Sequence, residues 1–326
     1  MLQPLFVARF CLLVVLGWPL FHAAMAQSPV YPHKPISIVV GYPPGGSTDL
    51  TGRAVAAELS KRLQVPVVVE NLGGAGGAIG AQKVAASVAD GYTLLVGSNN
   101  EIAIRGLVSP TVKYRLKDFT PIGLVGSQPM VLVASSHSRV KTMAQLITLA
   151  QANPEKLSYG SSGVGTALHL AGEMINDECG IRMTHVPYRG VAPLVNDLLG
   201  NNIDLGVFVL SSALPYIHSG QLTALGTTER VRSTVTPGVP TLSEHPYLKG
   251  LDINVWFALM GPAKLPSQVV EKLRKALTES LQSPELRKTL ESSGSTIAPL
   301  NVDMPRFLRE ETLKYQKIVD FAKIKE

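Results

Sequence analysis

Apolar and polar positions alternate along most of the chain with two different periods. Short apolar runs of strand length, such as 36–40 and 93–97, are followed by longer segments in which apolar residues recur every three or four positions, as in 50–63. The same alternation resumes at residue 142 and continues to residue 227. Strands that alternate with helices of this length predict an α/β fold built from parallel sheets with helical crossovers.

The pattern changes between residues 119 and 135, which read FTPIGLVGSQPMVLVAS. Two extended pieces with glycine and proline between them fit this segment, and no helix of ordinary length does. A long extended crossing of this kind is a candidate interdomain segment. Helical periodicity returns near the end of the chain, at 266–282, 284–293 and 304–323.

Residues 1–26 have the features of a secretory signal peptide. Arg9 precedes an apolar run of 12 residues, Phe10–Phe21, and Ala24-Met25-Ala26 fits the small-x-small rule for cleavage. The apolar run is short for a membrane span, which needs roughly 20 residues, although a retained N-terminal anchor is the alternative. We expect export and cleavage after Ala26.

Composition narrows the classes of protein that the chain can belong to. At about 150 residues per domain, its 326 residues predict two domains. The positively charged residues are scattered along the chain, and the densest group lies at 272–275. This group belongs to an amphipathic pattern, which is typical of a solvated helix face rather than of a nucleic-acid-binding surface. Without residues 1–26, Cys179 is the only cysteine. We therefore expect no internal disulfide, no nucleic acid as a partner, and a buried thiol at Cys179.

Two glycine-rich loops each lie between an apolar strand and a helix pattern. GYPPGGSTD occupies 41–49, and GSSGVGT occupies 160–166. A helix N-terminus carries free N–H donors and a partial positive charge, so either junction could bind an anion, without an arginine if the anion is a carboxylate. One loop alone is equally consistent with a turn in which Ser47, Asp49 or Thr166 caps its helix. Two matching loops in separate domains favour a cleft that holds a carboxylate from both sides.

Catalytic and cofactor signatures are incomplete. The glycines at 74–80 approach a nucleotide-binding fingerprint, but Ile79 occupies the last glycine position of G-x-G-x-x-G. GSSGVG fails to match G-x-S-x-G because Val164 occupies the final position. His169 and His185 have no spacing that suits a metal pair, and no second histidine lies close to His185 in the sequence. We expect no catalytic residue, metal or cofactor; a secreted hydrolase or a nucleotide-dependent oxidoreductase is the alternative.

Five segments occur in an order that resembles the Bug family of tripartite tricarboxylate transporter receptors: GYPPGGSTD, VVVENLGGAGGAIGA, DGYTLLVGS, GSSGVGTALHLAGEM and THVPYRGVAPLVNDLLGNNIDL. They span nearly all of the exported chain. The resemblance implies a periplasmic solute receptor, not an enzyme, with a type II-like two-lobed periplasmic-binding-protein fold, each lobe a sheet flanked by helices around a central cleft. It implies lobe 1 at 27–128 and 253–326, lobe 2 at 129–252, and a signal peptide at 1–26.

The resemblance also implies a ligand site. Its first-lobe residues are Tyr42, Gly45, Gly46, Ser47 and Thr48, and its second-lobe residues are Ser161, Gly163, Gly165, Thr166 and His169. Ser98 and Asn99 would face the cleft from its floor, and Asp204 would line the far side or solvate a turn. Tyr42 replaces a phenylalanine common in the family, so its hydroxyl would contact the ligand, or its ring would pack under the loop.

The implied ligand is a small organic acid, which includes di- and tricarboxylates, amino acids and aromatic acids. The implied partners are the membrane subunits of a tripartite tricarboxylate-type transporter, or a sensor protein. We expect a monomer whose lobes close about hinges near 126–130 and 250–255. Asn99-Asn100-Glu101 departs from the small-residue and histidine stretch of many relatives. Glu101 would therefore contact a cationic part of the ligand or point to solvent.

Overall fold

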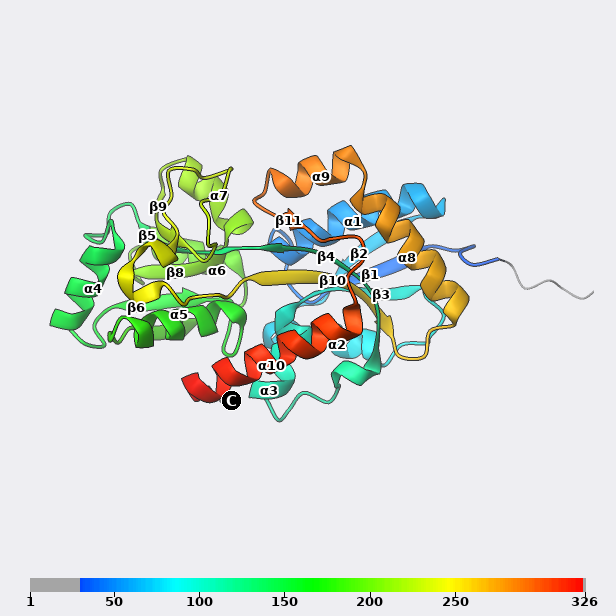
Figure 1. The fold of residues 1–326 in the computed structure, drawn as a ribbon, viewed down its shortest axis with the longest axis horizontal. Helices are drawn as coiled ribbons and strands as arrows, with labels where there is room; N and C mark the ends of the chain where they lie inside the picture. The colour runs from blue at the N-terminus through cyan, green and yellow to red at the C-terminus, as the bar shows by residue number, and fades with distance from the viewer. Residues whose placement is uncertain (1–29, 325–326) are drawn as a thin grey trace, which may run out of the picture. The chain divides into compact units, whose positions relative to one another are not determined.

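The computed structural model describes residues 30–324, so the predicted signal peptide at 1–26 lies outside the described residues. Contacts divide the chain into a unit of residues 1–30 and a compact unit of residues 31–326. The helices and strands of residues 30–324 all lie in the second unit (Figure 1). Within 30–324, no helix is both long and apolar enough to cross a membrane.

A six-stranded sheet has the strand order β11-β4-β10-β3-β1-β2. Strand β1 pairs in parallel with β2 and β3, whereas β10 pairs antiparallel with both β3 and β4. Helix α8 packs against α1 and β4, and α2 packs against β1 and β3. The elements of this part are β1 (Ile36–Val40), α1 (Ser47–Leu63), β2 (Val67–Asn71), α2 (Ala78–Ala85), β3 (Thr93–Ser98), α3 (Arg105–Val108), β4 (Phe119–Gln128), β10 (Val255–Pro262), α8 (Ser267–Leu281), α9 (Pro284–Glu291), β11 (Thr296–Ile297) and α10 (Met304–Ala322).

A five-stranded sheet has the strand order β7-β6-β8-β5-β9. Strand β6 pairs in parallel with β7 and β8, and β5 pairs antiparallel with β8 and β9. Its elements are β5 (Met130–Ser135), α4 (Met143–Ala152), β6 (Ser158–Ser161), α5 (Ala167–Glu178), β7 (Thr184–Pro187), α6 (Val191–Leu199), β8 (Leu205–Val209), α7 (Leu210–His218) and β9 (Leu222–Thr227).

Both sheets contain antiparallel as well as parallel pairs, so the expectation of parallel sheets holds for only part of each sheet. Strand β4 continues into β5 through Pro129 alone, without a helix between them. The 27 residues from Thr228 to Asn254 that lead into β10 form only two short turns of 3₁₀ helix, at Leu242–Glu244 and Pro246–Leu248. Antiparallel pairs need no helical crossover, so these extended connections place β5 and β10 antiparallel to their neighbours.

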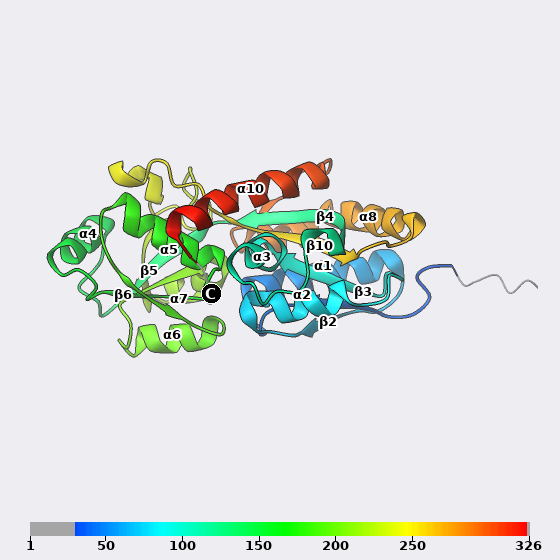
Figure 2. The same ribbon diagram turned by 90° about the horizontal axis from the view of Figure 1, so that it is seen from below.

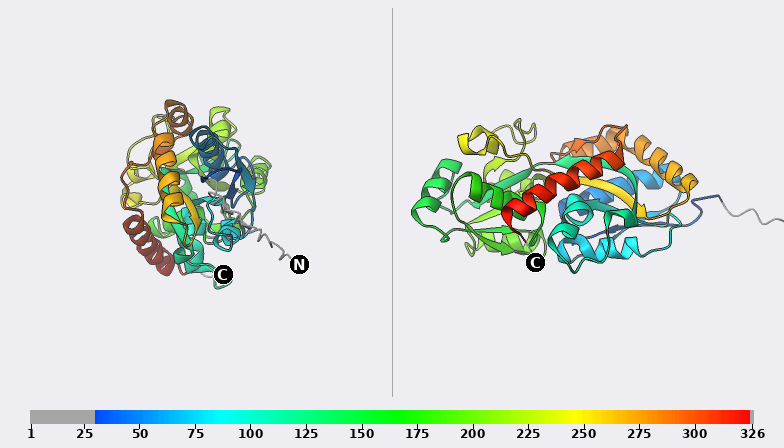
Figure 3. Two further views of the ribbon diagram at one scale, coloured as in Figure 1. Left: turned by 90° about the vertical axis from the view of Figure 1, so that its right-hand side faces the viewer. Right: turned by 60° about the horizontal axis from the view of Figure 1, so that its bottom comes forward.

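The paired strands β4 and β10 run from the six-stranded sheet toward the five-stranded sheet (Figure 1, Figure 2). Helix α10 lies against β4 and also reaches α5, as the right-hand view of Figure 3 shows. At the junction of the sheets, the Met130 N–H donates to Thr228 Oγ1, and that hydroxyl donates to Asn254 Oδ1, both at 2.9 Å. Three segments distant in sequence are therefore bonded together where the chain passes between the sheets.

The buried residues follow the alternation of the strands. In β5, Leu132 and Ala134 face the main core, whereas Val131 and Val133 face a second core. Helices α6 and α7 contribute Leu194, Leu198, Leu210 and Leu214 to that second core, so they cover one face of the five-stranded sheet. Helix α5 contributes to the main core on the other face. Cys179 is free and buried, as expected.

Three further short elements shape the loops beside the six-stranded sheet. The glycine-rich segment after β2 forms a 3₁₀ turn at Ala75–Gly77, which leads into α2. Directly after β3, Asn100–Ile104 is a single turn of π-helix, a feature often found at functional sites. A 3₁₀ turn at Leu116–Asp118 precedes β4.

Candidate functional site

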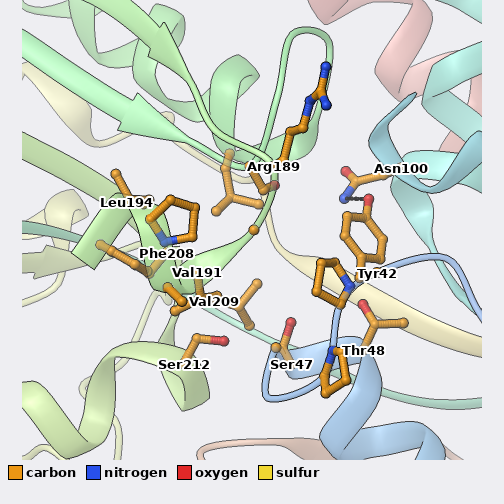
Figure 4. A pocket seen from close by; sticks show the side chains of 18 of the residues that line it. Tyr42, Ser47, Thr48, Asn100, Arg189, Val191, Leu194, Phe208, Val209 and Ser212 are labelled. Carbon is orange, nitrogen blue, oxygen red and sulfur yellow. Dashed lines mark hydrogen bonds between the residues drawn. The ribbon is translucent and has the colours of Figure 1, made fainter. Parts of the chain in front are cut away.

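A pocket of about 100 Å³ lies where loops from the two sheets meet. We call it the cleft pocket; Figure 4 shows its side chains. From the six-stranded part it is lined by Tyr42, Pro43, Pro44, Gly46, Ser47, Thr48, Asn100 and Val255, and from the five-stranded part by Ser162, Leu168, Arg189, Gly190, Val191, Ala192, Pro193, Leu194, Phe208, Val209 and Ser212.

Three helices begin at this pocket. Gly46 is the N-cap of α1, Gly190 is the N-cap of α6, and Val209 is the N-cap of α7. None of the three N-termini is capped by a side-chain hydrogen bond. Because the first N–H groups of a helix have no acceptor within the helix, three partial positive charges meet at one pocket.

The remaining lining divides into a polar part and an apolar part. Figure 4 shows the hydroxyls of Ser47 and Ser212 facing the pocket from one side, at the starts of α1 and α7. Leu194, Phe208 and Val209 form part of the apolar wall. Arg189 is the only charged residue in the lining. The pocket therefore suits a ligand with a negatively charged group and a carbon skeleton.

Asp49 stabilises the first glycine-rich loop by hydrogen bonds. Its carboxylate accepts hydrogen bonds from the Gly45 N–H at 2.9 Å, from Asn71 Nδ2 at 2.8 Å and from Arg53 Nε at 3.0 Å. Burial raises the pKa of Asp49, but these bonds outweigh burial and hold it below its usual value. Gly45, with φ of 87°, takes a left-handed conformation that favours glycine. Asp49 therefore fixes the loop and does not line the pocket.

Tyr42 and Asn100 connect this loop to the second sheet. The Tyr42 hydroxyl donates to the Gly76 carbonyl, and Asn100 Nδ2 donates to that hydroxyl, both at 2.9 Å. Asn100 Oδ1 accepts from the N–H of Ala167, the first residue of α5, at 2.7 Å. Burial raises the pKa of Tyr42 well above its usual value, so the phenol remains protonated. Asn100 thus joins elements of both sheets beside the cleft pocket.

The second-sheet residues expected from the sequence hold their own loop together. Thr166 Oγ1 accepts from the His169 N–H, so Thr166 caps α5, and it donates to the Gly163 carbonyl at 2.9 Å. His169 Nδ1 accepts from the Gly165 N–H at 3.0 Å, and Ser161 Oγ bonds His185 Nε2 at 2.7 Å. None of these residues lines the cleft pocket, which Ser162 and Leu168 reach instead.

His169 and His185 form a stacked pair, with ring centroids 3.8 Å apart and an angle of 12° between the rings. Sequence spacing did not suggest this contact. Burial lowers the pKa of His169 to about 4, and burial together with the neighbouring His169 lowers the pKa of His185 to about 3. Both rings are therefore neutral at neutral pH. Among residues 30–324, no three His, Cys, Asp or Glu side chains form a group that could hold a metal.

Ser98 and Asn99 lie in the interior rather than on the pocket wall. Ser98 Oγ donates to Glu101 Oε2 at 2.7 Å, and its N–H donates to Glu101 Oε1 at 2.9 Å. Asn99 Nδ2 donates to the Asn254 carbonyl and to the Tyr315 hydroxyl. The π-helical turn after β3 thus places the next residue, Asn100, at the cleft pocket.

Glu101 and Asp204 also lie away from the pocket. Glu101 is fully buried, so it does not point to solvent, and it is not part of the lining of the cleft pocket. Burial raises its pKa to about 7. Asp204 accepts from the Ser158 N–H and hydroxyl at the start of β8, the opposite end of the strand from Val209. Asp204 does not line the cleft pocket, and its role is not only to solvate a turn, because its hydrogen bonds to Ser158 connect the start of β8 to β6.

The starts of α6 and α7 line the cleft pocket, although neither was expected in the ligand site from the sequence. The segment PYRGVAP carried a usable signal, because β7 ends at Pro187 and Gly190 directly precedes a helix, as Gly46 does in the first loop. Helix α6 begins at Val191, directly after this glycine. The start of α7 contains no glycine or proline, so no turn signal marked it.

Comparison with known proteins identifies the family. The sequence profile of the tripartite tricarboxylate transporter family receptor, TctC, matches residues 51–324. The chain belongs to this family. The solved structure of the periplasmic binding protein BugD is 30% identical, with a TM-score of 0.85 over 90% of this chain and 99% of that one. R. palustris Rpa4515 with adipate is 30% identical, with a TM-score of 0.86 and the same coverage.

MatC from Rhodopseudomonas palustris with bound malate is 28% identical, with a TM-score of 0.82 over 89% of this chain and 100% of that one. Family and neighbours are thus solute receptors, and the protein is a periplasmic solute-binding protein with the two-lobed α/β fold.

Proposed function

We propose that this receptor captures a small organic acid by its carboxylate in the cleft pocket. The observation that carries the proposal is the convergence of three uncapped helix N-termini and two serine hydroxyls on one pocket without an acidic side chain. Neutral, preorganised donors bind an anion without the cost of burying an extra charge. The adipate and malate in two structural neighbours are acids of the proposed class.

A site of this kind can bind an organic acid with micromolar affinity. Hydrogen bonds to an ionised group contribute about 1.5–3 kcal/mol each. Four bonds near the upper end, less an association cost of about 4 kcal/mol, leave roughly the 8 kcal/mol of a micromolar complex. The apolar side chains Leu194, Phe208 and Val209 add contact with the carbon skeleton. No carboxylate lines the pocket to pair an ammonium group, so we propose an acid without an amino substituent.

In the proposed cycle, lobe 1 comprises residues 27–128 and 253–326, and lobe 2 comprises residues 129–252. Hinges near 126–130 and 250–255 open and close the cleft around the ligand. The single-residue link at Pro129 and the bonds among Met130, Thr228 and Asn254 support this assignment. The monomeric receptor, released by cleavage after Ala26, delivers the acid to the membrane subunits of a tripartite tricarboxylate-type transporter or to a sensor.

A thermal-shift screen of organic acids, amino acids and nucleotides tests the proposal. An acid at 100 times its dissociation constant should stabilise the protein by about 2.7 kcal/mol. We expect acids without an amino group to raise the melting temperature, and nucleotides to leave it unchanged. If nucleotides raise it and no acid does, the protein does not act as a carboxylate receptor and the enzyme alternative gains support.

A further inference from the structure

Helix α3 contacts the second glycine-rich loop outside the cleft pocket. Figure 1 and Figure 2 show α3 on the side of the six-stranded part that faces the five-stranded part. Arg105 Nη1 donates to the Val164 carbonyl at 2.9 Å. Val108 lies so close to Gly165 that a Cβ at position 165 would overlap Val108 Cγ2. We call these two interactions the α3 contact, and none of its four residues lines the cleft pocket.

The α3 contact is buried and depends on a close approach of the two lobes. Arg105 and Val108 are each only 2% exposed, although arginine is rarely buried to this extent. Gly76 lies between Arg105 and Thr166, because a Cβ on Gly76 would be 3.0 Å from Arg105 Cδ and 3.6 Å from Thr166 Cγ2. Gly76 and Gly165 also have φ values of 59° and 66°, which favour glycine. The two glycines therefore allow α3 to reach the loop.

The α3 contact holds a segment that forms part of the pocket wall. Ser162 on the same loop lines the cleft pocket, and so does Leu168 in the first turn of α5. The bond from the Ala167 N–H to Asn100 Oδ1 joins this segment to the six-stranded part at a second point. Both connections are made by protein atoms alone. Separation of the lobes would break them and carry Ser162 away from the first glycine-rich loop.

We propose that the α3 contact is a latch that closes the cleft in a fraction of the molecules before an acid binds. This inference rests on the proposed hinge motion. The apparent dissociation constant of a ligand equals the intrinsic constant divided by the fraction of molecules in the binding-competent form. Arg105 is therefore a positioning residue: it strengthens acid binding through the loop that carries Ser162, without a contact of its own to the acid.

Double electron–electron resonance without added acid tests the latch, because it measures the distance between spin labels on the two lobes. Labels at Ala57→Cys in α1 and Asn196→Cys in α6 occupy exposed positions on two helices that begin at the cleft pocket, and Cys179 is buried. We expect the labelled parent protein to show a short-distance population. Arg105→Met keeps the length of the side chain but has no donor, so it should lower the ratio of short to long distances at least about threefold. Arg105→Lys keeps a donor and should restore part of that ratio.

A second variant tests the latch independently of the arginine. Val108→Ala removes the methyl groups that lie against Gly165 and should lower the ratio in the same direction. It decides the question if Arg105→Met does not fold. Arg274→Met is the matched control, because Arg274 Nη2 donates to the Pro121 carbonyl at 3.0 Å within the six-stranded part, and it should leave the ratio unchanged.

The same measurement with an excess of butyrate, succinate or citrate separates the latch from the proposed function. A short-distance population that Arg105→Met and Val108→Ala both reduce supports the latch, and it does so even if none of these acids changes the distances, a result that would count against acid capture. A parent protein with only the long distance, which an acid shortens, overturns the latch and leaves the hinge motion intact. A ratio that neither variant lowers also overturns the latch. One unchanged distance in every variant, with and without acid, overturns both the latch and the hinge motion.

Discussion

Replacing Glu101 with glutamine should stabilise the protein at alkaline pH. The Glu101 carboxyl is completely buried, and its two oxygens accept bonds from the backbone and side chain of Ser98. The titratable groups that face it are the phenols of Tyr42 and Tyr114, whose pKa values are also raised by burial. Glutamine keeps an acceptor for the Ser98 N–H and offers an amide donor to the Ser98 hydroxyl, so the packing is retained.

The magnitude follows from the change in pKa on folding. Burial raises the pKa of Glu101 from 4.5 to about 7, so the folded state holds the proton more tightly than the unfolded state. The free energy of unfolding is therefore highest below pH 4.5 and falls as the pH rises through 7. At 1.36 kcal/mol per pKa unit, the total loss is about 3 kcal/mol. Glu101→Gln removes this loss.

Urea unfolding followed by circular dichroism, at several values between pH 4 and pH 9, measures the effect. Glu101→Gln should match the wild type within about 1 kcal/mol near pH 4 and exceed it by about 3 kcal/mol at pH 8. Glu271→Gln, at an exposed position on α8, should change stability by less than about 0.5 kcal/mol throughout. A difference between Glu101→Gln and wild type that does not grow with pH would show that folding does not raise the pKa of Glu101.

Three further variants test the assignment of roles. In Gly46→Val, the new Cβ would lie 4.0 Å from Val191 Cγ2, and the φ of −81° at position 46 suits any residue. Calorimetry should show acid binding at least tenfold weaker, with an unchanged melting temperature. Retained affinity would place the ligand elsewhere. Thr166→Val loses the cap of α5, so urea unfolding should show a loss of about 1 kcal/mol with acid binding kept; lost binding would mean that Thr166 contacts the ligand. His169→Asn keeps an acceptor for the Gly165 N–H but removes the imidazole ring. Burial lowers the pKa of this ring from 6.5 to about 4, so the ring binds protons more readily in the unfolded state. The wild type should therefore lose stability as the pH falls from 6.5 to 4, and the variant should lose less. Equal losses would show that His169 does not titrate differently on folding.

Much of the fold was predictable because hydrophobic periodicity reports which residues are buried. The strand at 36–40 has the same bounds in prediction and structure, and α1 begins only three residues before the predicted start at Leu50. Hydrophobic periodicity does not depend on strand direction. The antiparallel pairing of β5 and β10 therefore could not be predicted from the sequences of these strands.

The lining of the cleft pocket was predictable only where a local sequence signature coincided with it. The first loop has a strand, glycines and a helix start, and the structure places Gly46, Ser47 and Thr48 of that loop at the cleft pocket. The second loop has the same signature, yet Thr166 bonds its own helix instead of facing the pocket. Whether a capping side chain turns toward its helix or toward a ligand depends on tertiary packing, which the local sequence does not contain. His169 and His185 meet because β7 pairs with β6, a contact that no spacing reveals.

The most direct test of the carboxylate site is a crystal structure of the receptor with the acid that gives the largest thermal shift. We expect a carboxylate in the cleft pocket, with oxygens about 3 Å from donors at the starts of α1, α6 or α7, including the hydroxyl of Ser47 or Ser212. An acid bound outside the cleft pocket, with no contact to any of these helix starts, would contradict it.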